Sequence, residues 1–175
     1  MGIDSVAVVP RSSDFLIESK FSVEQIHSAF SQKEYWLARQ VAFDGVGKLD
    51  SLVIDTDGAV NVVIKADLRH DGLSGLVARF YPRDWQTVHE ETWSPTGDGK
   101  VRGEVSFASH GAPGSGAGTA LLTPTQNGSC LKGSATVEFK VPLIGGKIEG
   151  MICRQLGGQL TEVLRFTEDW IAENA

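Results

Sequence analysis

The last part of the chain, residues 141–175, carries apolar side chains at the spacing of a helix. They recur at steps of three and four residues, at Ile148, Ile152, Leu156, Leu160, Val163, Leu164, Phe166 and Trp170. This period is typical of an amphipathic helix. At 1.5 Å per residue, a helix from about residue 146 to 173 is roughly 40 Å long. The pattern therefore predicts a long C-terminal helix that needs a large apolar surface to lie on.

Before this helix, the chain is predicted to form one strand, two short helices and six further strands. The first strand covers residues 14–21, where β-forming residues partly alternate. Two capping-box patterns predict the starts of the helices, at Ser22 with Gln25 and at Ser31 with Glu34. The six strands are expected at 48–56, 59–68, 85–93, 100–109, 119–125 and 129–141.

Two turn signals show how neighbouring strands are connected. Asp57-Gly58 and Asn127-Gly128 are hairpin dipeptides, which predict that the strands flanking them are antiparallel. Residues 110–118 (HGAPGSGAG) read as a long flexible connector, because no helix follows to make them a phosphate-binding loop. An antiparallel sheet with its helices on one face gives an α+β domain. Because seven twisted strands curl, a long helix across the concave face is expected to leave a cavity.

This order of elements, with the segments 141–149 (VPLIGGKIE) and 89–93 (HEETW), resembles the START-like superfamily, also called SRPBCC or helix-grip. More narrowly, the chain is similar to an actinobacterial family of unknown function within that superfamily. The resemblance covers about residues 14–173. It implies a helix-grip fold: a curved antiparallel seven-stranded sheet, two short helices after the first strand, and a long C-terminal helix over the concave face.

The resemblance also implies a deep, mainly apolar cavity between the sheet and the C-terminal helix. Members of the superfamily use this cavity for lipids, polyketides, hormones and hydrophobic metabolites. A minority are cyclases, hydrolases or dehydratases, and some are co-chaperones. The narrower family supplies no catalytic motif to transfer to this chain.

Composition narrows the classes of partner. The 175 residues are expected to form one START-like ligand-binding domain, 14–175, after a flexible tail, 1–13. The net charge of −6 argues against nucleic-acid binding and against an anionic membrane surface as the main partner. The sequence contains no membrane-spanning run, and Cys130 and Cys153 fit no disulfide framework, so a cytoplasmic location is expected.

Polar candidates gather on the strand predicted at 85–93. His89, Glu91 and Trp93 share one face of it with Trp85, because side chains alternate along a strand. If this face looks inward, it places a polar spot in an apolar pocket, able to orient a ligand or move a proton. If it looks outward, it is a solvated set of side chains. The two indoles favour the inward orientation, whereas Val88 on the opposite face opposes it.

Other candidates line the expected cavity or close it. The cavity set combines the strand residues with positions on other elements: Trp85, His89, Glu91, Trp93, Phe107, Val137, Phe139, Ile152 and Leu156. Leu76, Phe80 and Tyr81 are candidates for a lid, or alternatively for a small satellite core. Glu149 falls among the apolar positions of the long helix, where we expect it to cap the free amides of the first turn.

The remaining histidines have no metal-ligand spacing, so neither a metal nor a cofactor is expected. We therefore expect a binding, transport or sequestration protein for a hydrophobic small molecule or lipid, rather than an enzyme. It would be a monomer or a weak homodimer. Two alternatives remain open: a cyclase or dehydratase using His89 and Glu91, and a protein-interaction module with a filled core.

Overall fold

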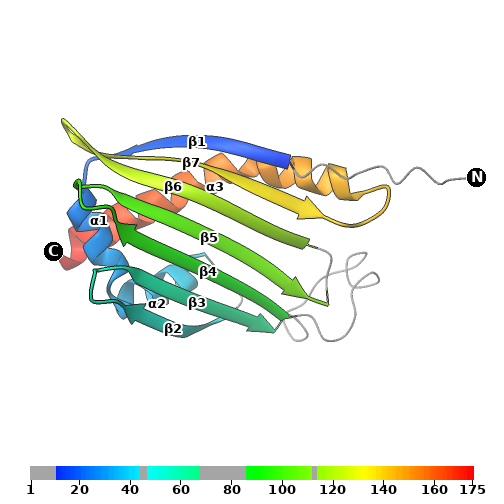
Figure 1. Ribbon diagram of the computed structural model, residues 1–175, viewed down its shortest axis with the longest axis horizontal. Helices are drawn as coiled ribbons and strands as arrows, with labels where there is room; N and C mark the ends of the chain where they lie inside the picture. The colour runs from blue at the N-terminus through cyan, green and yellow to red at the C-terminus, as the bar shows by residue number, and fades with distance from the viewer. Residues whose placement is uncertain (1–10, 44–46, 68–85, 112–113) are drawn as a thin grey trace, which may run out of the picture.

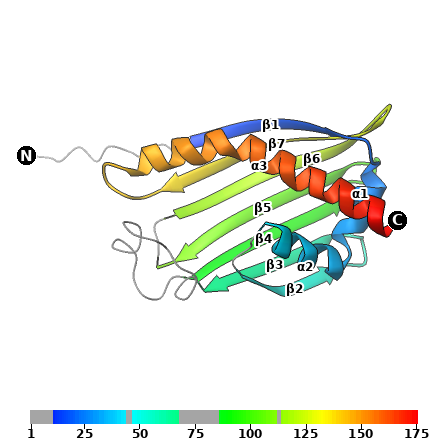
Figure 2. The ribbon, with the colours of Figure 1, turned by 180° about the vertical axis from the view of Figure 1, so that it is seen from behind.

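The computed structural model describes residues 11–43, 47–67, 86–111 and 114–175. These residues form one curved antiparallel sheet, and the helices among them all lie on the same face of it (Figures 1 and 2). The predicted α+β helix-grip architecture is confirmed. The seven strands are β1 (Arg11–Ser19), β2 (Lys48–Ile54), β3 (Val60–Asp67), β4 (Gln86–Pro95), β5 (Val101–His110), β6 (Gly114–Thr125) and β7 (Gly128–Phe139).

The sheet order is β1-β7-β6-β5-β4-β3-β2, and every neighbouring pair is antiparallel. The chain therefore starts at one edge of the sheet, and α1 and α2 carry it to the opposite edge. From β2 onward each strand pairs with the next, and β7 also pairs with β1, which forms the other edge of the sheet. This local pairing is what the predicted hairpins require.

The two short helices begin differently from each other. α1 (Val23–Phe30) has the predicted capping box, in which the Gln25 N–H donates to Ser22 Oγ at 3.2 Å and the Ser22 N–H donates to Gln25 Oε1 at 2.9 Å. The second predicted capping box is wrong. α2 (Lys33–Ala42) begins after Gln32 without a side-chain cap. Ser31 instead ends α1, where its hydroxyl donates to the His27 carbonyl at 3.1 Å.

The long helix α3 (Gly145–Asn174) packs mainly on β1 and β7, and its C-terminal part reaches α1 (Figure 2). Its burial is uneven along its length. Gly145, Glu149 and Gly150 are buried near its start, and Leu164 begins the buried C-terminal part. Between them, residues 151–163 are at most half-buried. The middle of α3 therefore leaves room between itself and the sheet.

An aromatic cluster forms the core beneath the C-terminal half of α3. Tyr35 and Trp36 are fully buried, and the ring centroids of Phe30 and of Trp93 on the sheet are 4.8 Å apart. The ring of Tyr35 meets that of Trp170 edge to face, with centroids 5.5 Å apart. Such pairs contribute about 0.5–1.5 kcal/mol each beyond the area that they bury. The cluster therefore joins α1, α2, α3 and β4 at one end of the domain.

Two predicted connections need correction. The expected connector 110–118 is mostly strand, because β6 begins at Gly114, and Gly114, Gly116 and Gly118 pair with β7. Their glycine content indicated a loop, but the long partner strand supplies the hydrogen-bond ladder. The turn at Asp57-Gly58 is a longer loop than predicted, since β2 ends at Ile54 and β3 starts at Val60.

Candidate functional site

A pocket of about 520 Å³ lies between α2, the inner face of β3–β5 and the middle of α3. Its described lining is apolar on several sides, where it is formed by Trp36, Phe43, Ile64, Ala66, Phe107 and Val163. The polar lining residues are Arg39, Gln40, Thr87, His89, Gln159 and Glu162. The described lining of the pocket therefore combines aromatic walls with as many polar as apolar residues.

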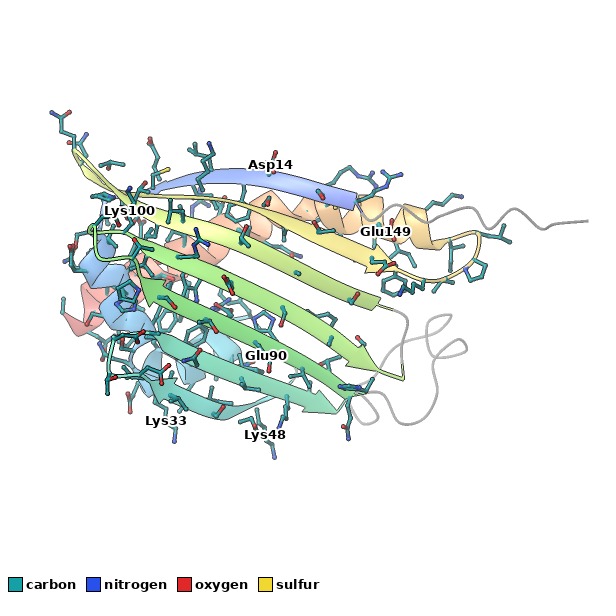
Figure 3. All side chains as sticks on the ribbon, in the orientation of Figure 1. Asp14, Lys33, Lys48, Glu90, Lys100 and Glu149 are labelled. Carbon is teal, nitrogen blue, oxygen red and sulfur yellow. The ribbon has the colours of Figure 1, made fainter. Side chains whose placement is uncertain are left out.

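The alternation of β4 decides which of its side chains face the helices. Thr87, Glu91 and Trp93 are buried on the inner face, whereas Glu90 is exposed on the outer face (Figure 3). His89 shares the inner face, because side chains two residues apart point the same way. The structure thus places His89, Glu91 and Trp93 on the side covered by the helices, and His89 lines the pocket.

Gly103 makes the inward position of Trp93 possible. Gly103 on β5 pairs with Trp93 on β4, and a Cβ added to this glycine would lie 2.5 Å from the indole ring. The indole therefore occupies the space that a side chain on β5 would fill. Packing of Trp93 over Gly103 holds this end of β4 against the core.

Glu91 is the centre of a buried polar network behind the pocket. It is 3% exposed, and its two oxygens accept from groups on two elements. Oε1 lies 3.1 Å from Arg39 Nη2 and 2.8 Å from His89 Nε2, while Oε2 accepts from Trp93 Nε1 at 2.9 Å. Both carboxylate oxygens are thus engaged with protein groups, as a buried charge requires.

These partners control the ionisation of Glu91. Burial alone raises the pKa of this carboxyl group. The positive charge of Arg39 and the hydrogen bonds from His89 and Trp93 outweigh burial and lower the pKa from 4.5 to about 2. Glu91 is therefore ionised at neutral pH and acts only as an acceptor.

Arg39 is a charged pocket residue that the sequence interpretation missed. Its guanidinium stacks on the Trp36 ring, 5.0 Å from the centroid, while binding Glu91 and lining the pocket. A helical wheel of α2 contained the signal, since Trp36, Arg39, Gln40 and Phe43 follow helical spacing on one face. A lone arginine on a short helix is usually exposed to solvent, so the helical wheel alone does not identify Arg39 as a pocket residue.

The other predicted cavity residues are distributed unevenly. Phe107 lines the pocket with His89, whereas Glu91 and Trp93 lie behind the lining. Val137, Phe139, Ile152 and Leu156 are half-buried on β7 and α3 and do not belong to the described lining. The contribution of α3 comes from Gln159, Glu162 and Val163 instead, further along the helix than expected. Trp85 and the lid candidates Leu76, Phe80 and Tyr81 lie outside the described residues.

Glu149 has a different role from the predicted one. It is 1% exposed, and its Oε1 accepts a 2.8 Å hydrogen bond from the backbone N–H of Phe139, at the end of β7. α3 begins at Gly145 after Ile144, without a side-chain cap, so the expected capping of the helix's own amides is wrong. The carboxylate instead joins α3 to the sheet (Figure 3).

Two further features bear on the kind of site. Among the described residues, no group of three or more histidine, cysteine, aspartate or glutamate side chains is placed to hold a metal ion. Within the same parts of the chain, none of the helices is both long enough and apolar enough to cross a membrane.

Comparison with known proteins identifies the family. The family model described as Protein of unknown function (DUF2505) matches residues 14–171. Uncharacterized proteins of Mycobacterium tuberculosis (strain H37Rv) and Mycobacterium bovis are 34% identical over 174 residues. Each alignment covers 95% of this chain and 99% of the relative.

Solved structures share the fold at low sequence identity. A START superfamily protein from Mycobacterium smegmatis has a TM-score of 0.53 at 13% identity, with coverage of 94% of this chain and 99% of that one. Norcoclaurine synthase from Thalictrum flavum, in complex with dopamine and hydroxybenzaldehyde, has a TM-score of 0.50 at 16% identity, covering 95% and 89% of the two chains. The chain therefore belongs to the DUF2505 family and has the START-like fold.

Proposed function

We propose that this protein binds a hydrophobic small molecule or lipid in the pocket between α2, β3–β5 and α3. The observation that carries the proposal is the pocket itself, about 520 Å³ with aromatic walls from Trp36, Phe43 and Phe107. Small-molecule sites typically measure about 300–1,000 Å³. A space of this size, lined by aromatic rings and by polar groups, favours a ligand over further side-chain packing.

The half-buried middle of α3 supports the same proposal. Val163 lines the pocket but is only intermediate in burial, although it belongs to the apolar positions of the helix. A helix of this length is stabilised by burying its apolar face, so incomplete burial leaves free energy to be gained from a bound apolar molecule. The Thalictrum flavum neighbour, which holds two small aromatic molecules, is an example of this fold used for binding.

The experiment is native mass spectrometry of the full chain purified from its own cells, followed by melting-temperature measurements with fatty acids, sterols and aromatic polyketides. A bound adduct, or a melting temperature raised in proportion to the logarithm of ligand concentration, is the expected result. If repeated preparations carry no adduct and no compound in the panel raises the melting temperature, the proposal is refuted.

A second candidate function is acid–base catalysis on a bound small molecule, as in a cyclase or dehydratase. The observation that favours it is the 2.8 Å contact between His89 Nε2 and Glu91 Oε1 beside the pocket. Histidine held by a carboxylate is a common general base. In this arrangement His89 would transfer the proton, and the buried Glu91 would only orient the imidazole ring of His89. Loss of turnover in H89A with retained ligand binding would separate catalysis from binding alone.

A further inference from the structure

We propose that the ligand is a neutral apolar molecule carrying a hydroxyl group, and that this hydroxyl donates a hydrogen bond to Nδ1 of His89. The proposal rests on the proposed function, because it assigns a ligand class to the same pocket. It follows from three features of the polar network: the saturation of Glu91, the tautomer that this imposes on His89, and the charge balance with Arg39.

The first feature is that Glu91 is occupied by the protein. Its two oxygens accept from Arg39, His89 and Trp93 at 2.8–3.1 Å, and the side chain is 3% exposed. It is also absent from the lining of the pocket. A ligand therefore meets His89 rather than the carboxylate, and Glu91 acts as a positioning residue.

The second feature is the tautomer of His89. A carboxylate has no proton to donate, so the contact between Glu91 Oε1 and His89 Nε2 requires the proton on Nε2. In the neutral imidazole the other nitrogen, Nδ1, then carries a lone pair and accepts hydrogen bonds. The His89 side chain is 31% exposed and lines the pocket, and among the described residues its ring bonds only to Glu91.

The third feature is the charge balance beside His89. Arg39 and Glu91 carry opposite charges 3.1 Å apart, so they neutralise each other. Glu162, which also lines the pocket, pairs with Arg165 at 2.9 Å. Among the described lining residues, the polar side thus offers a neutral acceptor without an uncompensated cation. A carboxylate ligand would face a lone pair on Nδ1, whereas a hydroxyl group donates a proton to this acceptor.

The aromatic residues of the lining indicate what the apolar part of the ligand looks like. Phe43, directly after α2, and Phe107 on β5 line the pocket with His89, and both side chains are exposed. Aromatic walls favour flat or ring-containing molecules, whose faces and edges pack well against them. The recognised class is therefore an aromatic or polycyclic phenol or alcohol.

The test compares three probes of one shape on the full chain: 2-naphthol, 2-methylnaphthalene and 2-naphthoate. Binding is measured by isothermal titration calorimetry at pH 7.5. One hydrogen bond of ordinary strength predicts that 2-naphthol binds up to about tenfold more tightly than 2-methylnaphthalene. In H89F this ratio is expected to fall to about one, while 2-methylnaphthalene still binds. H89A provides the same test if the larger ring disturbs the fold.

The matched control is H110F, because His110 is exposed on the outer face of β5. That variant is expected to keep the ratio of the wild-type protein. Equal binding of naphthol and methylnaphthalene, preference for naphthoate, or a ratio that survives in both His89 variants would overturn the inference while leaving ligand binding intact. If none of the three probes binds, the inference fails together with the assignment of the pocket.

Discussion

The backbone N–H of Phe139 donates a 2.8 Å hydrogen bond to Glu149 Oε1, which joins the last residue of β7 to the first turns of α3. The five residues between these elements include Leu143, whose φ of 70° is unusual for a residue with a side chain. The buried carboxylate therefore holds the helix against the sheet where the connecting backbone turns sharply. This contact determines where α3 starts its path across the domain.

Removing this carboxylate is expected to destabilise the protein. E149A leaves the Phe139 N–H without its acceptor in a part-buried position, which costs about 1.5–3 kcal/mol in the free energy of unfolding. E149Q keeps an acceptor oxygen of the same shape, so we expect it to lose less than E149A. Urea denaturation followed by circular dichroism measures both variants. Equal losses in the two variants would show that the hydrogen bond to Phe139 is not the cause.

A second buried hydrogen bond joins α2 to α3. Tyr35 Oη lies 2.8 Å from Thr167 Oγ1, whose own proton is donated to the Val163 carbonyl at 2.8 Å. The tyrosine hydroxyl must therefore be the donor in the first contact, because threonine has only one hydroxyl proton.

The variant Y35F removes this donor and keeps the aromatic ring. We expect it to lower the free energy of unfolding by about 1 kcal/mol, the net value of one buried hydrogen bond. The variant T167V removes the same contact from the other side. The double variant should lose less than the sum of the two single losses. Fully additive losses in a thermal unfolding series would contradict the interaction.

The order of elements was predictable because its signals are local. Ser22 with Gln25 marks the start of α1, and short hairpins specify most of the sheet. The strand at 114–118 was not predictable in the same way. Its glycines form a ladder only because β7, more than ten residues later, is long enough to pair with them. Local composition contains no information about the length of a partner strand.

The site was predictable only in part. The two-residue period places His89 with Glu91, but it does not decide which face of β4 meets the helices. That choice depends on Gly103 of the neighbouring strand, which leaves room for the Trp93 ring. Arg39 joins the site from α2 through tertiary packing. Spacing along the sequence cannot reveal contacts between elements that meet only in the folded chain.

Alanine substitutions at Gly103 and Gly157 are expected to have opposite effects on stability, because the space around the two glycines differs. In G103A the added methyl group meets the Trp93 ring at 2.5 Å, so we expect a loss of about 1–3 kcal/mol from overpacking. In G157A nothing lies within 4 Å of the added group, and alanine favours the helix by about 1 kcal/mol. Chemical denaturation should therefore show a lower free energy of unfolding for G103A and a higher one for G157A than for the wild-type protein. A stable G103A protein would contradict the packing of Trp93 on the inner face.

A large side chain placed in the pocket should block ligand binding. Val163 is half-buried on α3 and lines the pocket, so V163W is expected to fill part of its 520 Å³. We expect ligand affinity to fall at least tenfold, whereas M151W should bind normally. Met151 is the matched control because it lies on the same helix, is exposed and is not among the described lining residues. Calorimetry with a ligand found in the melting-temperature screen makes the comparison, and equal affinities would place the ligand elsewhere.

The ionisation of Glu91 predicts how stability depends on pH. Its pKa is about 2 in the folded protein and 4.5 ordinarily, so the unfolded chain binds the proton more readily. The stabilisation is therefore fully present above about pH 4.5 and is lost as the pH falls toward 2. A shift of this size corresponds to about 3 kcal/mol. Arg39, His89 and Trp93 are the groups that hold the carboxylate ionised.

The variant E91Q tests this dependence. Glutamine cannot ionise, and it leaves Arg39 without its counter-charge, so we expect E91Q to be less stable than the wild-type protein by about 3 kcal/mol at pH 7. The difference should shrink as the pH falls from 5 to 3, since the wild-type protein alone loses this contribution. Asp98, whose pKa is also lowered to about 2, is common to both proteins and cancels in the comparison. Urea titrations at pH 7, 5, 4 and 3 measure the two curves. A difference that stays constant over this range would mean that the proton does not bind at Glu91.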